Sequence, residues 1–198
     1  LEYYVIPELS IKAGRMNLSY DNERILGSVG WAQQARSHDL VLVKYEGLFK
    51  LHAGIAYHEN SDRSNNFYLG PDAYKAMQFI WAKYDIEELK MSFLFLNNGI
   101  AYDKTVGPGG QIIDQGISFS QTVGPLVSYT AEKFGALASL YYQGGKDGGQ
   151  NSLSAFYANL EGSLFMVENL GLKLGYEFLS GTAYDETEKN HSFSPFYG

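Results

Sequence analysis

Apolar and polar residues alternate with a period of two in several stretches of this chain. In the stretch 48–58, every second residue is apolar or aromatic and the residues between are small or charged: Phe49, Leu51, Ala53, Ile55 and Tyr57 against Lys50, His52, Gly54, Ala56 and His58. Successive side chains of a strand point to opposite faces, so this pattern predicts a strand with one apolar face and one water-facing face. The stretches 89–95 and 172–178 show the same parity.

Following the alternation along the chain predicts about ten strands. Most reach the roughly 9–11 residues that a tilted strand needs to cross a bilayer. The predicted strands are 2–6, 8–20, 39–46, 48–58, 74–85, 88–98, 116–130, 133–143, 152–165 and 169–181. Lys12 and Arg15 have opposite parity in the second of these, so either a bulge intervenes or one of them lies at an interface.

The connections between the predicted strands alternate in length. Short links lie at 7, 47, 86–87, 131–132 and 166–168, and long links at 21–38, 59–73, 99–115, 144–151 and from 182 onward. Outer-membrane barrels have short periplasmic turns and longer external loops, whereas the hairpins of a sandwich vary in length at both ends. The chain is therefore predicted to be all-β, an antiparallel transmembrane β-barrel of the porin type in the bacterial outer membrane.

Charged residues indicate which face of each predicted strand meets water. A Lys or Arg on the lipid face costs about 2–4 kcal/mol at the bilayer midplane, so we expect Lys50, His52, Lys90 and Lys173 to face the lumen. They form either a ladder of cations or merely the polar lining that any water-filled barrel needs. Tyrosines near strand ends are typical of interfacial girdles, here Tyr20, Tyr45, Tyr57, Tyr74, Tyr84, Tyr129 and Tyr176.

Composition narrows the possible functions. The chain has 198 residues, no cysteine and a net charge of −7, which excludes disulfide or thiolate chemistry and argues against nucleic acid as a partner. Neighbouring strand residues point to opposite faces, so Ser37, His38 and Asp39 do not form a catalytic triad. The four histidines show no zinc spacing. We expect no enzymatic activity, no metal and no cofactor.

The two ends of the chain also carry an expectation. The chain begins in a half strand and ends in a loop, 191–198, with no strand after it. The prediction is a single β-barrel domain over 1–198, truncated at both ends. A small closed barrel of ten strands is the alternative.

The segment 14–39 resembles the alginate export family of outer-membrane porins. The likeness rests on Gly14-Arg15, Leu18, Tyr20, Arg24-Ile25-Leu26-Gly27, Trp31, Gln34, Arg36 and Asp39, and 193–198 is similar to a loop segment of such proteins. The resemblance implies a monomeric channel that passes an anionic polysaccharide or related small solutes. Arg15, Arg24 and Arg36 would line the lumen, or would brace an inward-folded first loop by pairing with Asp21, Glu23 and Asp39.

The functional hypothesis from sequence is a passive outer-membrane channel. Its partners would be outer-membrane lipid and lipopolysaccharide, the transported solutes, and other envelope proteins. Two alternatives remain: a barrel with a structural or docking role and no open pore, and a soluble β-barrel that binds a ligand in an aromatic interior.

Overall fold

All ten predicted strands are present in the structure, a computed structural model that describes residues 1–28, 30, 36–57, 74–110, 112–167 and 170–195. The strands are β1 (Glu2–Ile6), β2 (Leu9–Met16), β3 (His38–Glu46), β4 (Lys50–Tyr57), β5 (Tyr74–Ile86), β6 (Leu89–Val106), β7 (Ile112–Thr130), β8 (Phe134–Lys146), β9 (Ser152–Val167) and β10 (Leu170–Leu179). A short eleventh strand, β11 (Lys189–Asn190), follows.

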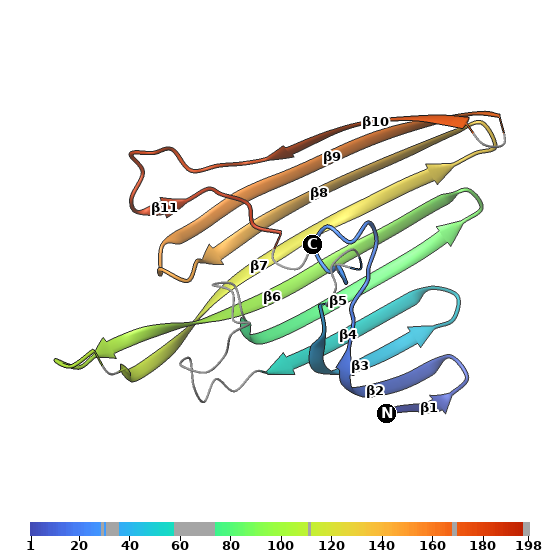
Figure 1. The fold of residues 1–198 in the computed structure, drawn as a ribbon. Coiled ribbons are helices and arrows are strands. Elements are labelled where there is room, and N and C mark those ends of the chain that lie inside the picture. The colour runs from blue at the N-terminus through green and yellow to red at the C-terminus, as the bar shows by residue number, and fades with distance from the viewer. Residues whose placement is uncertain (29, 31–35, 58–73, 111, 168–169, 196–198) are drawn as a thin grey trace.

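The strands form one sheet in which each of the first ten pairs antiparallel with its neighbours in the chain (Figure 1). Only β11 departs from this order, because it pairs parallel with β9. In the described part of the chain β1 and β10 are the two edges and do not pair with each other, so the sheet is not closed. No helix among the described residues is long and apolar enough to cross a membrane.

The two faces of the sheet differ in what covers them. Residues 17–28 lie across one face, here called the covered face, and the opposite face is called the bare face (Figure 1). In β4, His52 and Ala56 point to the covered face and are buried, whereas Leu51 and Ile55 point to the bare face and are exposed. The parity predicted for 48–58 is therefore confirmed within β4.

The bare face is apolar over most of its area. It exposes large hydrophobic side chains from β2 to β10: Ile11, Val41, Val43, Leu51, Ile55, Tyr57, Ile80, Phe93, Phe95, Leu140, Phe156, Leu160, Leu172, Leu174 and Phe178. Three amides in the middle of this face bond to one another. Asn97 donates to Gln78 Oε1 at 2.6 Å, and Gln121 donates to Asn97 Oδ1 at 2.7 Å.

The covered face holds the buried core of the protein. Its large side chains include Leu40, Leu42, Met77, Phe79, Trp81, Leu94, Leu96, Tyr141 and Tyr157, and the loop contributes Leu18, Tyr20, Ile25 and Leu26. The Phe79 ring lies over Gly54 on the neighbouring strand, where any Cβ would collide with the ring. A glycine is thus required for the ring to lie flat on the sheet.

Strand limits differ from the prediction at one end of the sheet. Four of the five predicted short links are confirmed, at 7–8, 47–49, 87–88 and 131–133, and their side is called the short-turn end. The fifth, predicted at 166–168, falls partly outside the described residues. At the other end, β2 stops at Met16, because its partner β3 begins opposite it at His38. Leu18 and Tyr20, predicted to continue that strand, instead bury themselves on the covered face.

Two connections predicted to be long are short. The link predicted at 99–115 consists of residues 107–111, because β6 and β7 continue as a projecting hairpin up to the pair Val106 and Ile112 (Figure 1). The link predicted at 144–151 shrinks to 147–151. The projecting hairpin has little apolar alternation, so backbone pairing extends it where the side-chain pattern fades.

Candidate functional site

The loop 17–28 folds into a compact turn on the covered face. Tyr20 N donates to Leu26 O at 3.0 Å, and Glu23 N donates to Tyr20 O at 2.9 Å. Asp21 and Glu23 have positive φ angles of 55° and 60°, a conformation that Asp tolerates better than most residues. The turn gives the loop a fixed tip made of residues 21–24.

Tyr20 anchors the near side of the loop. Its hydroxyl lies 3.0 Å from His52 Nδ1, and its ring makes edge contacts with His52 and Phe79 at centroid distances of 5.5 Å. The Trp81 ring lies 4.9 Å away. Aromatic pairs at such distances contribute about 0.5–1.5 kcal/mol beyond the area they bury, so this cluster fixes the loop on β4 and β5.

Asp21 forms the next contact, with β5. Trp81 Nε1 donates to both carboxylate oxygens of Asp21, at 3.0 and 3.1 Å. Although Asp21 as a whole residue is exposed, its carboxyl group sits among packed side chains, and this burial raises its pKa. The hydrogen bond from Trp81 and the charge of Lys83 act in the opposite direction.

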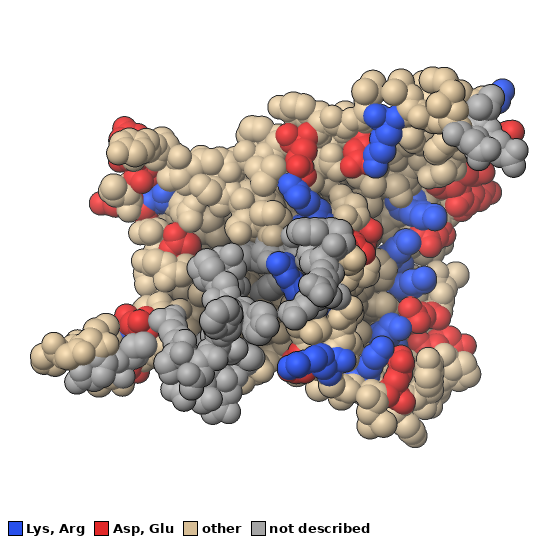
Figure 2. Space-filling model, in the orientation of Figure 1, with Lys and Arg blue, Asp and Glu red and all other residues tan. Residues whose placement is uncertain are grey.

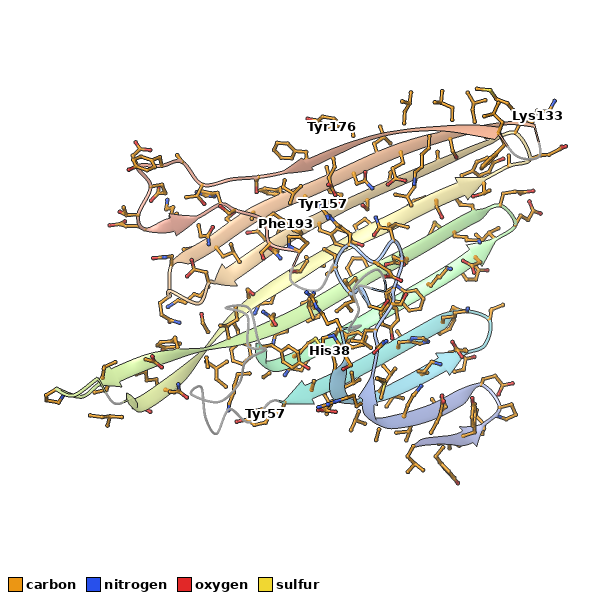
Figure 3. The ribbon with its side chains drawn as sticks, in the orientation of Figure 1. His38, Tyr57, Lys133, Tyr157, Tyr176 and Phe193 are labelled. Atoms are coloured by element: carbon orange, nitrogen blue, oxygen red, sulfur yellow. The ribbon has the colours of Figure 1, made fainter. Side chains whose placement is uncertain are left out.

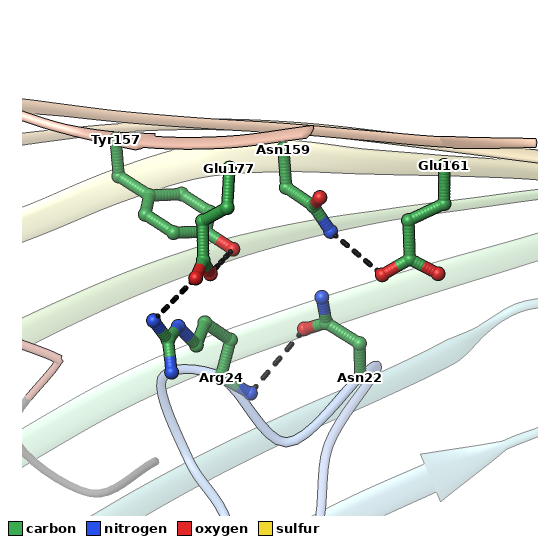
Figure 4. A network of polar contacts seen from close by, with 6 residues as sticks. All are labelled: Asn22, Arg24, Tyr157, Asn159, Glu161 and Glu177. Carbon is green, nitrogen blue, oxygen red and sulfur yellow. Dashed lines mark hydrogen bonds and ion pairs between the residues drawn. The ribbon is translucent and has the colours of Figure 1, made fainter. Parts of the chain in front are cut away.

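Arg24 links the loop to β10, the edge strand farthest from β2. Its Nη2 lies 2.8 Å from Glu177 Oε2 on β10, and Tyr157 on β9 donates its hydroxyl to the other Glu177 oxygen at 2.7 Å (Figure 4). The Arg24 guanidinium also lies 5.8 Å from the Tyr157 ring centroid. The loop therefore spans the covered face, from β2 and β3 to β9 and β10.

A second segment, 191–195, covers the adjoining area. Phe193 packs on Tyr157 with ring centroids 5.2 Å apart (Figure 3). Gln143 on β8 holds the same segment with two hydrogen bonds to Ser194, donating to its carbonyl at 2.7 Å and accepting from its N–H at 2.9 Å. The middle of the covered face is thus closed by two inward segments.

Charged side chains gather on the covered face toward the short-turn end, where lysines and acids alternate across the strands (Figure 2). Ion pairs join Lys12 to Glu2, Lys44 to Glu46, Lys83 to Asp85 and Lys173 to Glu161. Lys50 and Lys90 have no ion-pair partner within 4.0 Å in the described part of the chain. Positive and negative charges are therefore largely compensated here.

Arg15 and Asp39 form an ion pair, as one of the two alternatives from sequence had it, but the pair lies away from the loop. They are cross-strand partners on the bare face, where Arg15 Nη2 lies 2.7 Å from Asp39 Oδ2 and Nε lies 3.1 Å from Oδ1. The placement of Arg15 on the covered face is therefore wrong, because the register of β2 turns it outward. Lys12 points to the covered face and Arg15 to the bare face, which accounts for the opposite parity of these two residues.

The other predicted residues fall into three groups. His52 is buried under Tyr20, while Lys50, Lys90 and Lys173 lie in the charged zone of the covered face. Arg36 closes the base of the loop, where its N–H donates to Ser28 O at 2.8 Å. Gln34, like Trp31 and His58, lies outside the described residues.

Arg24 is held by Glu177, not by the neighbouring acids 21 and 23 that the sequence suggested. Asp21 accepts hydrogen bonds from Trp81, and Glu23 accepts hydrogen bonds from Ser19 and Ser28 within the loop. The parity of β10 does place Glu177 opposite its apolar residues. No signal in the sequence, however, connects it to a loop 153 residues away.

Two tyrosines predicted for the interfacial girdles are also placed differently. Tyr20 lies in the loop cluster, and Tyr74 bonds to His38 Nδ1 at 3.1 Å. Aromatic pairs do occur near the strand ends of the bare face. They join Tyr45 to Phe49 and Tyr129 to Phe134 at the short-turn end, and Tyr142 to Phe156 at the other end.

Two pockets adjoin the loop tip on its short-turn side. One of about 230 Å³ is lined by Asp21, Lys83 and Lys90, and one of about 440 Å³ by Arg24, Glu161 and Glu177. Asn22 and Leu137 line both. In the described part of the chain, no three His, Asp or Glu side chains are grouped as a metal ion would require.

No protein-family model matches the chain, and comparison with curated proteins finds no match. The resemblance of 14–39 to the alginate export porins stays a prediction from sequence.

Proposed function

We propose that this chain forms, or forms part of, an outer-membrane channel for small polar solutes, narrowed by the loop 17–28. In this proposal the bare face meets lipid and the covered face lines the lumen. The observation that carries it is the contrast between a broad, exposed apolar face and a face with charged side chains and an inward loop. The anionic polysaccharide implied by the family resemblance is one candidate solute.

The bare face supports a lipid environment in two ways. Its exposed Leu, Ile, Val and Phe residues extend over nine successive strands, whereas soluble monomers rarely expose contiguous apolar patches larger than a few hundred Å². Its amides Gln78, Asn97 and Gln121 bond to one another. Polar groups facing hydrocarbon need such internal partners, because lipid offers none. Both features favour a membrane barrel over a soluble ligand binder.

The aromatic pairs add the expected boundaries of an apolar band. Tyr45 with Phe49 and Tyr129 with Phe134 lie at the short-turn end, and Tyr142 with Phe156 lies at the opposite end. Girdles of this kind flank the lipid-facing band of outer-membrane barrels, where the amphipathic rings meet both headgroups and acyl chains.

A structural or docking barrel without an open pore is the second candidate. Leu18, Ile25 and Leu26 pack tightly on the apolar centre of the covered face, and each is at most 3% exposed. A dry, closely packed plug of this kind favours a closed lumen. The channel proposal therefore requires a passage beside the loop, where the charged zone and the two pockets lie.

The test is conductance of the purified chain in planar bilayers, with the loop tip either free or fixed. The chain has no cysteine, so Arg24→Cys with Glu177→Cys introduces the only two thiols. A reducible bifunctional thiol reagent joining them should leave a small conductance, and reduction should raise it, because the loop can then move. Each single cysteine variant, treated with the same reagent, is the matched control.

The outcomes separate the two candidates. A conductance step that rises on reduction only in the double variant supports a loop-narrowed channel. Zero conductance before and after reduction, from protein that keeps its β-sheet circular dichroism, would sink the channel proposal and leave the docking barrel.

A further inference from the structure

The larger of the two pockets, about 440 Å³, lies between the loop tip and strands β8–β10. Asn22 and Arg24 form the loop wall, and Asn159, Glu161 and Glu177 belong to the sheet wall (Figure 4). Small-molecule sites commonly measure about 300–1,000 Å³, so the pocket is large enough for a small-molecule ligand.

Every carboxylate oxygen of Glu177 is already engaged. Oε2 accepts from Arg24 Nη2 at 2.8 Å, and Oε1 accepts from the Tyr157 hydroxyl at 2.7 Å. Arg24 keeps N–H groups that Glu177 does not use, among them a buried Nε without a hydrogen-bond partner in the described part of the chain. An anionic ligand that approached them would also lie close to the Glu177 carboxylate, which would repel it. A ligand that displaced Glu177 from Arg24 would leave the Glu177 charge without a partner. The free energy lost in this way exceeds what one new ion pair returns, unless the ligand replaces every contact of Glu177.

Glu161, the second carboxylate of the pocket, also has a partner on each of its two oxygens. Lys173 Nζ forms an ion pair with Glu161 Oε2, and Asn159 Nδ2 donates to Glu161 Oε1 at 3.1 Å. The pocket thus holds two positive and two negative side chains, and each positive one faces a negative one. Its net charge is zero, so neither anions nor cations gain a general electrostatic advantage there.

Besides the Nε of Arg24, the groups that remain available are neutral amide groups. Asn22 Oδ1 accepts a long bond from Arg24 N at 3.3 Å, and its Nδ2 has no partner among the described residues. Asn159 uses Nδ2 on Glu161 and has no described partner for Oδ1. These two side chains come from opposite walls of the pocket (Figure 4). The site therefore offers an uncharged amide donor and an uncharged amide acceptor, beside the Nε of Arg24.

Leu137 adds an apolar surface beside these amides, since it lines the same pocket from β8. A neutral donor, a neutral acceptor and an apolar patch match a sugar ring or a polyol. Hydroxyl groups both donate and accept, and the C–H face packs on apolar carbon. We propose that this pocket binds a neutral polyhydroxylated small molecule in preference to an acidic one.

This inference rests on the proposed function in one respect: only if the chain is a channel is the bound molecule a solute held beside the loop. Binding itself requires the loop and sheet alone. It also departs from the anionic cargo that the family resemblance implies, because the pocket's cations are already neutralised.

The test is isothermal titration of the whole chain in detergent with two matched ligand pairs: glucose against glucuronate, and galactose against galacturonate. Within each pair the acid differs by one carboxylate. At least one neutral sugar should bind about tenfold more tightly than its acid, the penalty expected for an unpaired charge. Equal or tighter binding of both acids, or no binding of either neutral sugar, would overturn the proposal.

Two variants sharpen the result. Asn22→Ala removes the free donor and should weaken sugar binding about three- to tenfold, as expected for one hydrogen bond. Asn17→Ala, an exposed Asn of the same loop outside the pocket, should leave binding unchanged. Glu161→Gln keeps the shape, frees Lys173 and should shift the preference toward the acid. No shift would contradict the charge argument.

The sugar-binding proposal and the channel proposal can be contradicted independently of each other. A chain that conducts but binds none of the sugars retains the channel and loses the pocket. One that binds a sugar without conducting retains the pocket and favours the docking barrel.

Discussion

The two faces of this sheet are built from the same strands, yet only one of them is packed. On the covered face Phe79, Met77 and Leu96 are at most 2% exposed, because a loop and a second segment lie over them. On the bare face Phe93 and Ile55 are 48% and 60% exposed, although both lie within strands. The difference shows that the strands have large apolar side chains on both faces. The loop 17–28 and the segment 191–195 cover only one of these faces.

Phe79→Ala should have the largest effect, because it removes a fully packed ring from the covered face. Truncating a buried Phe typically costs about 3–5 kcal/mol of unfolding free energy. Phe93→Ala on the bare face is the matched control and should cost about 1 kcal/mol or less. The measurement is urea unfolding in the same detergent. Equal losses would show that the two faces are packed alike.

Ile55→Lys tests whether the bare face meets lipid. If it does, a lysine at this position should cost about 2–4 kcal/mol in bilayer-reconstituted protein. Leu48→Lys, in the short turn 47–49 where the side chain is 82% exposed, should cost almost nothing. Unfolding in liposomes compares them. An Ile55→Lys protein as stable as the Leu48→Lys protein would remove the lipid assignment.

The ion pair of Arg24 and Glu177 should contribute a smaller amount. Both side chains are roughly one third exposed, and partly exposed pairs contribute about 0.5–1 kcal/mol because water screens them. A double-mutant cycle with Arg24→Met and Glu177→Gln isolates this coupling. Arg15→Met with Asp39→Asn, a more exposed pair on the bare face, is the comparison and should show less coupling in detergent solution.

Asp21 should give the smallest effect, seen as a pH dependence. Burial raises its pKa, so the folded state binds this proton more tightly than the unfolded state. Its contribution to stability is therefore greatest at low pH and falls as the pH rises from 3.8 through the raised pKa.

Trp81 fluorescence in a Trp31→Phe background should report the titration of Asp21. The midpoint should lie above 3.8, and Asp21→Asn should abolish the transition. A midpoint at or below 3.8 would contradict the raised pKa.

The strands were predictable because each carries its own signal. Alternation located β4 within two residues of its observed limits, and the gaps between alternating stretches located the short links. The projecting part of β6 and β7 was missed, since its side chains do not alternate and only backbone pairing holds it. Local patterns thus identify strands that bury a face, and they fail where pairing alone extends a strand.

The candidate site was less predictable, because its contacts join distant parts of the chain. An inward loop bearing Arg24 was expected, but Glu177 and Tyr157 as its partners were not. The side of Arg15 was misjudged for a related reason. Parity puts Lys12 and Arg15 on opposite faces, and the continuous register of β2 with β3 places Lys12 on the covered face and Arg15 on the bare face.

The contact between Arg24 and Glu177 also has a consequence for the order of folding. The two residues are 153 positions apart, so their contact closes a segment of about three quarters of the 198-residue chain. Such a closure is entropically unfavourable until the strands between them have paired. The loop should therefore dock only after the sheet has formed, and until then the covered face stays open to water.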